Sequence, residues 1–167
     1  QRFSNLRATI FDLPATLALT ECYVREAGLS NRIRLISGDY RVDKIPRSYD
    51  VIFLSNIIHG ESFEVNQRLM VDLSSVLKPG GSIIIKDHIL DHTRANPPVG
   101  PVFSLLMLLA TQGGRCYALH EVKADAGAHI VGDVAQVTLV AARQNHITQS
   151  RAVRCQDNAA CHSVSAE

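Results

Sequence analysis

The stretch Asp50–Ser62 reads DVIFLSNIIHGES and decides how the rest of the chain is interpreted. Its first half is a nearly continuous run of apolar residues, which is typical of a parallel strand buried on both faces. The run continues to a histidine, His59, which is followed directly by Gly60. The pattern therefore predicts a buried strand that finishes at His59 and is broken by Gly60, with a titratable side chain at the edge of a sheet.

Similar apolar segments that end in an acid lie on both sides of this stretch. The segments between them have apolar residues at helical spacing. The predicted strands are Leu6–Asp12, Ile33–Asp39, Tyr49–Asn56 and Ser82–Asp87; the predicted helices are Pro14–Gly28 and about Glu64–Leu77; and Lys78–Gly81 (KPGG) is a predicted turn. Strands alternating with helices predict an α/β domain with a mostly parallel sheet. Ligands of such sheets bind outside the carboxyl ends of the strands, so the polar residues there are expected on one rim.

The pattern is looser after Asp87. A Pro-rich loop leads to the apolar segment Val102–Ala110, whose composition predicts a buried core helix. His129–Arg143 resembles two short strands or one interrupted strand, and residues 144–167 are polar and rich in small side chains. We expect one domain over residues 1–143 and a loosely ordered tail over residues 144–167.

Composition narrows the possible partners. The 17 basic and 16 acidic residues nearly cancel and form no long run, so no nucleic-acid groove is predicted. No apolar run approaches the roughly 20 residues of a membrane span, and no secretory signal begins the chain, which makes the cytoplasm the expected compartment. The four cysteines lack metal or disulfide spacing and are expected to be reduced thiols. His88 and His92 have the spacing of a metal pair, but the Pro-rich loop argues against a helix there, so we predict no metal site.

Four segments, taken together, are more specific. ATIFDLP, RIRLISGDY, YDVIFLSNIIH and LKPGGSIIIKDHIL, in this order and spacing, resemble the small-molecule O-methyltransferases that use S-adenosylmethionine, over roughly residues 1–123. That family includes plant phenolic, acetylserotonin and bacterial polyketide enzymes. The resemblance implies a Rossmann-like class I methyltransferase sheet, S-adenosylmethionine as cofactor, and a small, hydroxylated, aromatic acceptor. It also implies a homodimer for the full-length enzyme.

The resemblance assigns cofactor-binding roles to residues at the strand ends. Asp12 would bind the ribose, Gly38, Asp39 and Tyr40 would surround the adenine, and Ser55 would lie beside the methionine part. Local sequence leaves alternatives open for the two acids. Asp12 precedes Pro14 and could cap a helix, and Asp39 could cap a turn.

The resemblance also implies that His59 is the general base and that Asp87 orients it. A phenol with a pKa of about 10 is a poor nucleophile until its proton is removed, and an imidazole that titrates near neutral pH can take that proton. Without the family pattern, a histidine at the end of a buried strand is more often structural. Phe103 and Met107 are candidates for a wall that contacts an aromatic substrate, a role compatible with a place in the core.

The chain departs from the family pattern in several places. The first strand and the glycine-rich loop that follows it in the family have no counterpart here, so we expect an incomplete sheet and a fragment or truncated product. Ser55 replaces a lysine of the plant enzymes, Gly60 replaces an aspartate, and Cys116 falls where a glutamate is common. Two alternative functions follow: a non-catalytic remnant of such an enzyme, and an NAD-dependent oxidoreductase. The second lacks both a Tyr-x-x-x-Lys pair and a glycine fingerprint.

Overall fold

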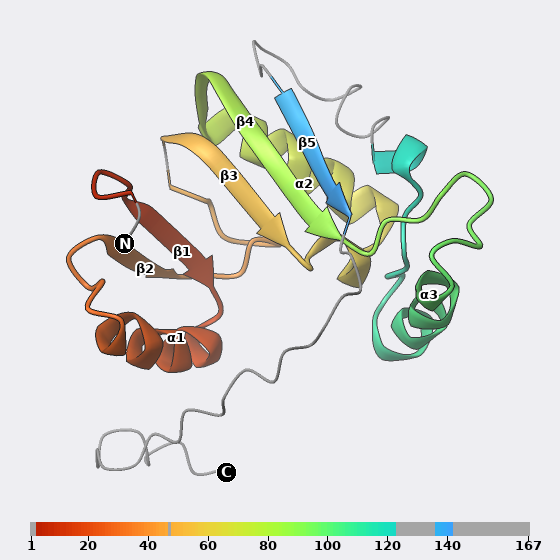
Figure 1. Ribbon diagram of the computed structural model, residues 1–167, viewed down its shortest axis with the longest axis horizontal. Coiled ribbons are helices and arrows are strands. Elements are labelled where there is room, and N and C mark those ends of the chain that lie inside the picture. The colour runs from red at the N-terminus through yellow and green to blue at the C-terminus, as the bar shows by residue number, and fades with distance from the viewer. Residues whose placement is uncertain (1–2, 47, 123–135, 142–167) are drawn as a thin grey trace.

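The computed structural model describes residues 3–46, 48–122 and 136–141. Strands and helices alternate along the chain (Figure 1). In order they are β1 (Ala8–Asp12), α1 (Pro14–Glu26), β2 (Ile33–Ser37), β3 (Tyr49–Ser55), the 3₁₀ turn η1 (Ile58–Gly60), α2 (Phe63–Val76), β4 (Leu77–Asp87), α3 (Val99–Ala110) and β5 (Gln136–Ala141). The prediction of an α/β fold is confirmed.

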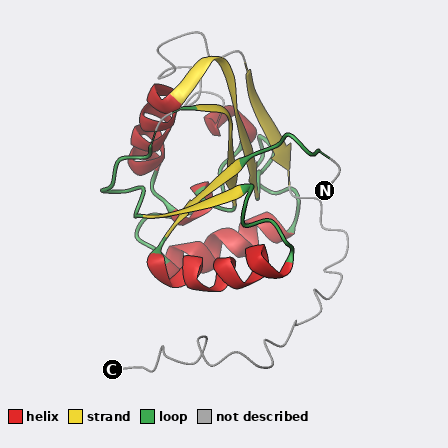
Figure 2. Cartoon of the chain, turned by 90° about the vertical axis from the view of Figure 1, so that its left-hand side faces the viewer, coloured by secondary structure: helices red, strands yellow, loops and turns green. Residues whose placement is uncertain are grey.

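All observed strand pairs are parallel, and they form two small sheets. β1 pairs with β2, while β3, β4 and β5 pair in that order. The strands form the middle of the molecule and the helices lie outside them (Figure 2). The arrowheads of β1, β3, β4 and β5 point toward the same end (Figure 1). The arrangement is that of a partial Rossmann-like fold, and it brings the carboxyl ends of the strands to one rim.

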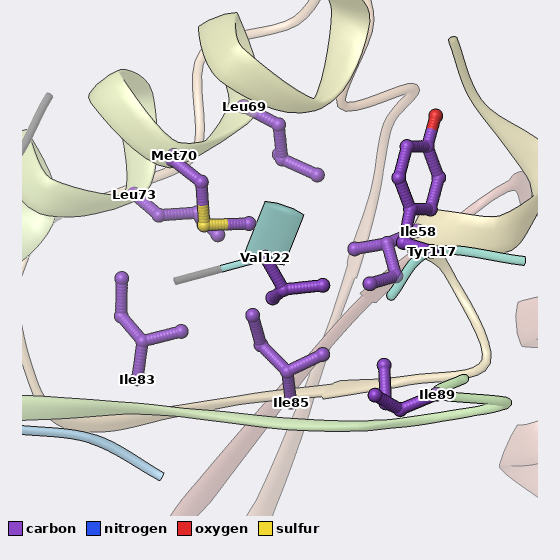
Figure 3. Close-up of a cluster of buried hydrophobic side chains, with 9 residues drawn as sticks. All are labelled: Ile58, Leu69, Met70, Leu73, Ile83, Ile85, Ile89, Tyr117 and Val122. Atoms are coloured by element: carbon purple, nitrogen blue, oxygen red, sulfur yellow. The ribbon is translucent and has the colours of Figure 1, made fainter. Parts of the chain in front are cut away.

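The main core lies between α2 and the sheet β3–β4–β5 (Figure 3). Apolar residues at helical spacing on α2 meet alternate residues of β4, where Ile83 and Ile85 are 0% and 1% exposed. The core cluster consists of Ile58, Leu69, Met70, Leu73, Ile83, Ile85, Ile89, Tyr117 and Val122. This core holds η1 and the end of β4, and therefore the residues between and beside them.

The opposite face of β3 is largely exposed. Val51 and Phe53 are more than half exposed, whereas Ile52 and Leu54 pack against the core. The prediction that this strand is buried on both faces is therefore wrong. An apolar run indicates that a strand can be buried on two sides, but burial also requires an element to cover each side.

The helix α3 differs from its prediction in the same way. The apolar segment is helical as expected, but Gly100 is its only buried residue, and the prediction of a buried core helix is wrong. The helix is apolar around its whole circumference, while the described residues contact it along one edge. The exposed apolar side chains are Val102, Leu105, Leu106, Leu108 and Leu109.

The predicted turn KPGG lies within β4. The strand begins at Leu77, directly after α2, and Gly80 has a φ of 76° that a residue without a side chain adopts easily. The register between β3 and β4 shifts at the same level, between Tyr49 and Val51. The four residues thus form an irregular start of the strand rather than a separate turn.

The unit β1–α1–β2 has a smaller core. In α1 the buried residues are Leu17, Cys22 and Val24; Ala27, predicted on this face, is exposed at the helix end. Gly28 follows with a φ of 68°, as predicted for a left-handed cap. No residue of β1 or β2 is fully buried. A cavity of about 600 Å³ separates the amino-terminal parts of these strands from that of β3.

Two predictions concern residues that the structure does not describe in full. β5 confirms one strand within the segment 129–143, but residues 129–135 lie outside the described residues. The predicted tail, residues 144–167, also lies outside them, so the domain boundary at residue 143 stays a prediction.

Candidate active site

The strand β3 ends four residues before His59. Asn56 adopts a left-handed conformation, with a φ of 58°, and its backbone N–H donates to the carbonyl of Lys86 at 2.8 Å. The strand thus ends at Ser55, close to the end of the predicted range Tyr49–Asn56, and the expectation that it continues to His59 is wrong because Asn56 turns the chain. Gly60 is not needed for this break, since a Cβ atom there would meet nothing within 4 Å.

His59 lies instead in the 3₁₀ turn η1, which the core and α2 hold in place. Ile58 is 3% exposed and belongs to the core, and its carbonyl accepts a hydrogen bond from the side-chain Nδ2 of Asn66 at 2.9 Å. Ser62 then caps α2 by accepting the backbone N–H of Val65. The turn is thus fixed by the core on one side and by the first turns of α2 on the other.

Asp87, at the end of β4, binds both the ring and the backbone of His59. The distance between His59 Nδ1 and Asp87 Oδ1 is 2.6 Å, and Asp87 Oδ2 accepts the backbone N–H of His59 at 3.4 Å. Oδ1 also accepts the backbone N–H of His88 at 2.7 Å. Asp87 is 1% exposed, and these donors compensate the cost of burying its carboxylate. A proton on Nδ1 leaves the lone pair of Nε2 available.

Aromatic rings surround this histidine. The rings of His59 and Phe103 meet edge to face. Their centroids lie 4.9 Å apart, and the angle between the two ring planes is 84°. His88 lies 4.4 Å from Phe103 and 6.0 Å from His59. Met107 follows Phe103 by one helical turn and is half-buried. The structure therefore brings His59, Asp87 and Phe103 together.

The residues predicted to bind a cofactor lie at the ends of β1 and β2. Asp12 Oδ1 accepts the backbone N–H of Leu13, and the Asp12 carbonyl accepts that of Gly38 at 3.0 Å. A Cβ atom on Gly38 would lie 2.7 Å from Phe11 Cε2, so a larger residue here would require the Phe11 ring to move. Asp39 Oδ1 accepts the backbone N–H of Arg41 at 2.9 Å. Asp39 thus caps a turn, as its alternative reading expected. The alternative for Asp12 is wrong, because Asp12 bonds the N–H of the adjacent Leu13 and α1 has no side-chain cap among the described residues.

A cavity of about 770 Å³ lies beside η1, in the range of roughly 300–1,000 Å³ that small-molecule sites occupy. Tyr40 lines it, together with Arg41, Asn56, Gly60, Glu61 and the end of α3. Asp12, Asp39 and Ser55 do not line it, and Ser55 is exposed. Of the predicted cofactor residues, the structure therefore brings only Tyr40 to this cavity.

Sequence reasoning missed two residues that shape the site. Glu61 is 5% exposed and binds Tyr40 and Arg41; the signal for it was an acid two residues after His59. Gly114 lies so close to η1 that a Cβ atom there would be 2.5 Å from the carbonyl oxygen of His59. Its only signal was the pair of glycines at residues 113–114.

Two classes of feature were searched for in the described part of the chain. It holds no group of three or more His, Cys, Asp or Glu side chains placed to bind a metal ion. None of its helices combines the length and apolar character that crossing a membrane requires.

Known proteins resemble this chain over most of its described length. The tetracenomycin polyketide synthesis 8-O-methyl transferase TcmO of Streptomyces glaucescens is 30% identical over 68% of the chain and 33% of its own length. The 3-hydroxy-5-methyl-1-naphthoate 3-O-methyltransferase of Streptomyces sahachiroi is 28% identical over 65% of the chain and 32% of its own length. The chain thus spans about a third of these relatives.

A solved structure agrees with these matches. The O-methyltransferase family 2 protein of Planctomyces limnophilus, in complex with apigenin, superposes with a TM-score of 0.72 and 30% identity. The superposition covers 77% of this chain and 38% of the other. Residues 1–127 also match the family described as the O-methyltransferase domain. The chain therefore belongs to the O-methyltransferase domain family.

Proposed function

We propose that this chain carries the catalytic centre of an S-adenosylmethionine-dependent O-methyltransferase that acts on a hydroxyl group of a small aromatic molecule. The observation that carries this proposal is the 2.6 Å contact between His59 Nδ1 and the buried Asp87, beside the ring of Phe103. Two relatives are named for methylating an oxygen, and one of these names specifies a hydroxyl on a naphthoate ring.

The residues present are compatible with the cofactor. The cavity beside η1 has one aromatic wall, Tyr40, and lies next to the carboxyl ends of the parallel strands, where such sheets bind nucleotides. Asp12, Gly38, Asp39 and Ser55 are proposed to hold its ribose, adenine and methionine parts from the adjoining rim. S-adenosylmethionine, when bound, supplies an electrophilic methyl group on a sulfonium.

His59 is proposed to act as the general base. Nε2 of His59 would accept the proton of the substrate hydroxyl, and the oxygen so activated would take the methyl group that the bound cofactor supplies. Asp87 holds the ring through Nδ1 and stabilises the imidazolium that results. Phe103 and Met107 are proposed to contact the aromatic ring of the acceptor, which restricts the approach of the hydroxyl.

A methyl-transfer assay on hydroxylated aromatic acceptors tests the roles of the two residues. His59→Ala and Asp87→Asn are expected to lower turnover by about 10²–10⁴-fold, the usual contribution of a positioned base. Cofactor binding by His59→Ala should stay at the wild-type level in calorimetric titration. His92→Ala is the matched control, because His92 is an exposed histidine in the loop after β4.

Turnover by His59→Ala within a few fold of wild type would show that His59 is not the base. If the wild-type chain does not bind S-adenosylmethionine at millimolar concentration, the alternative of a non-catalytic remnant would be favoured.

A further inference from the structure

A buried carboxylate stands two residues after the proposed base. The side chain of Glu61 is 6% exposed, and its backbone N–H donates to the carbonyl of Ile58 at the end of η1. Burying an ionised carboxylate is strongly unfavourable unless charged or polar groups compensate it. Glu61 therefore depends on the partners that surround it.

Those partners come from the loop after β2. Glu61 Oε1 accepts hydrogen bonds from Tyr40 Oη at 2.5 Å and from Arg41 Nε and Nη2 at 2.9 and 2.5 Å. Burial and the hydrogen bond to Glu61 raise the pKa of the Tyr40 phenol, so the hydroxyl stays protonated and donates. The guanidinium of Arg41 is more than half exposed and supplies the compensating charge at the surface.

The backbone of Glu61 is held as well. Its carbonyl oxygen accepts a hydrogen bond from the buried hydroxyl of Tyr117 at 2.6 Å. Tyr117 is 2% exposed and belongs to the main core. The residue thus joins three segments: the loop after β2, the turn that carries His59, and the core.

The same contacts fix one wall of the cavity beside η1. Tyr40, Arg41 and Glu61 all line this cavity, and Tyr40 also packs against the core cluster. With its hydroxyl held by Glu61, the ring of Tyr40 has little freedom to rotate away. One carboxylate therefore ties this wall of the cavity to η1.

We propose that Glu61 is a positioning residue that fixes Tyr40 in the cofactor cavity and ties that wall to the backbone segment of His59. The inference rests on the proposed function for its ligand, S-adenosylmethionine. Contact between Glu61 and the reacting atoms is not required. A purely stabilising Glu61 would change thermal stability and leave the affinity of the folded protein unaltered.

Calorimetric titration of the full chain with S-adenosylmethionine tests this role in Tyr40→Phe, Glu61→Gln and the double variant. Each single change is expected to weaken binding on the order of tenfold, the usual effect of losing a hydrogen bond to a charged group. Because the two residues act through each other, the double variant should lose no more than the weaker-binding single variant. Tyr23→Phe is the matched control, since it removes an exposed hydroxyl of α1.

Hydrogen exchange provides a readout that needs no cofactor. Tyr40→Phe is expected to accelerate amide exchange in residues 57–61, which are distant in sequence, whereas Tyr23→Phe leaves it unchanged. A thermal melt of each variant confirms that it is folded at the temperature of measurement.

The possible outcomes separate the two proposals. Binding by both single variants within twofold of wild type, or multiplied losses in the double variant, would overturn the role of Glu61 and leave the proposed function intact. If the wild-type chain does not bind S-adenosylmethionine, the proposed function fails for this chain. Unchanged exchange in residues 57–61 would then overturn the positioning role as well.

Discussion

The sheet β3–β4–β5 and the sheet β1–β2 are both parallel, yet the described residues pack against them to different degrees. α2 covers one face of the first sheet and buries Ile83 and Ile85 almost completely. α1 covers the second, where no strand residue is fully buried. The proposed base therefore lies on the better-packed unit, while most of the proposed cofactor residues lie on the other.

The largest expected effect is a difference between matched core substitutions. Ile85→Ala removes a fully buried side chain and should lower the free energy of unfolding by about 2–5 kcal/mol. Ile10→Ala on β1 removes a half-buried one and should cost less than half as much, because less area leaves water on folding. Urea denaturation followed by circular dichroism measures both. Equal losses would contradict the difference in packing between the two sheets.

Glycine substitutions test the same difference between the two units, because Gly114 and Gly38 each lie against another part of the chain. Alanine at Gly114 meets the backbone of η1, with His59 O at 2.5 Å and Gly60 C at 2.9 Å, and this turn is fixed by the core. Alanine at Gly38 meets the ring of Phe11, a half-buried side chain that can swing aside. Gly114→Ala should therefore cost about 1–3 kcal/mol and displace His59, while Gly38→Ala should cost less.

Denaturation and methyl-transfer activity distinguish these two glycine variants. The control is Gly60→Ala, which meets no atom within 4 Å and should leave stability nearly unchanged. A larger loss of stability in Gly38→Ala than in Gly114→Ala would reverse the expected order.

The smallest expected effect is a difference in cysteine accessibility. Cys116 and Cys22 are both buried, one in each unit. Burial, with the nearby charge of Asp87, raises the pKa of the Cys116 thiol from 9.0 to about 11. Its thiolate is therefore scarce at neutral pH, and its exposure requires opening of the better-packed unit. Iodoacetamide labelling measured by peptide mass spectrometry should modify Cys22 first.

The same pKa has a consequence for stability against pH. Because the folded-state pKa of Cys116 is raised, the neutral thiol contributes stability that is complete below pH 9.0 and is lost as the pH rises toward about 11. Cys116→Ser should flatten this part of the stability curve, and Cys22→Ser serves as the control. Faster labelling of Cys116 than of Cys22 would indicate that the units open in the opposite order.

Much of the fold could be predicted from the sequence, because strands and helices follow from local periodicity. The strand ends at Asp12 and Asp87 and the cap at Gly28 were read from residue type alone. The exposure of Phe53 and of α3 was not predictable in this way, since apolar composition does not specify which element covers a side chain.

The candidate site was predictable only in part. His59 and Asp87 followed from their positions at the ends of apolar runs and from the family pattern, and their contact at 2.6 Å was expected. Glu61 was missed because its partners, Tyr40 and Arg41, are about 20 residues away in sequence and meet it only in the folded chain. The break at Asn56 depends on a bond to Lys86 that no local pattern indicates.

The apolar surface of α3 has a practical consequence. Leu105, Leu106, Leu108 and Leu109 are each more than half exposed on one twelve-residue helix. Contiguous apolar patches promote association between molecules as concentration rises. Light scattering over a dilution series, with a leucine-to-serine change on α3 for comparison, therefore belongs before any affinity or turnover measurement, because aggregates lower the apparent number of active molecules.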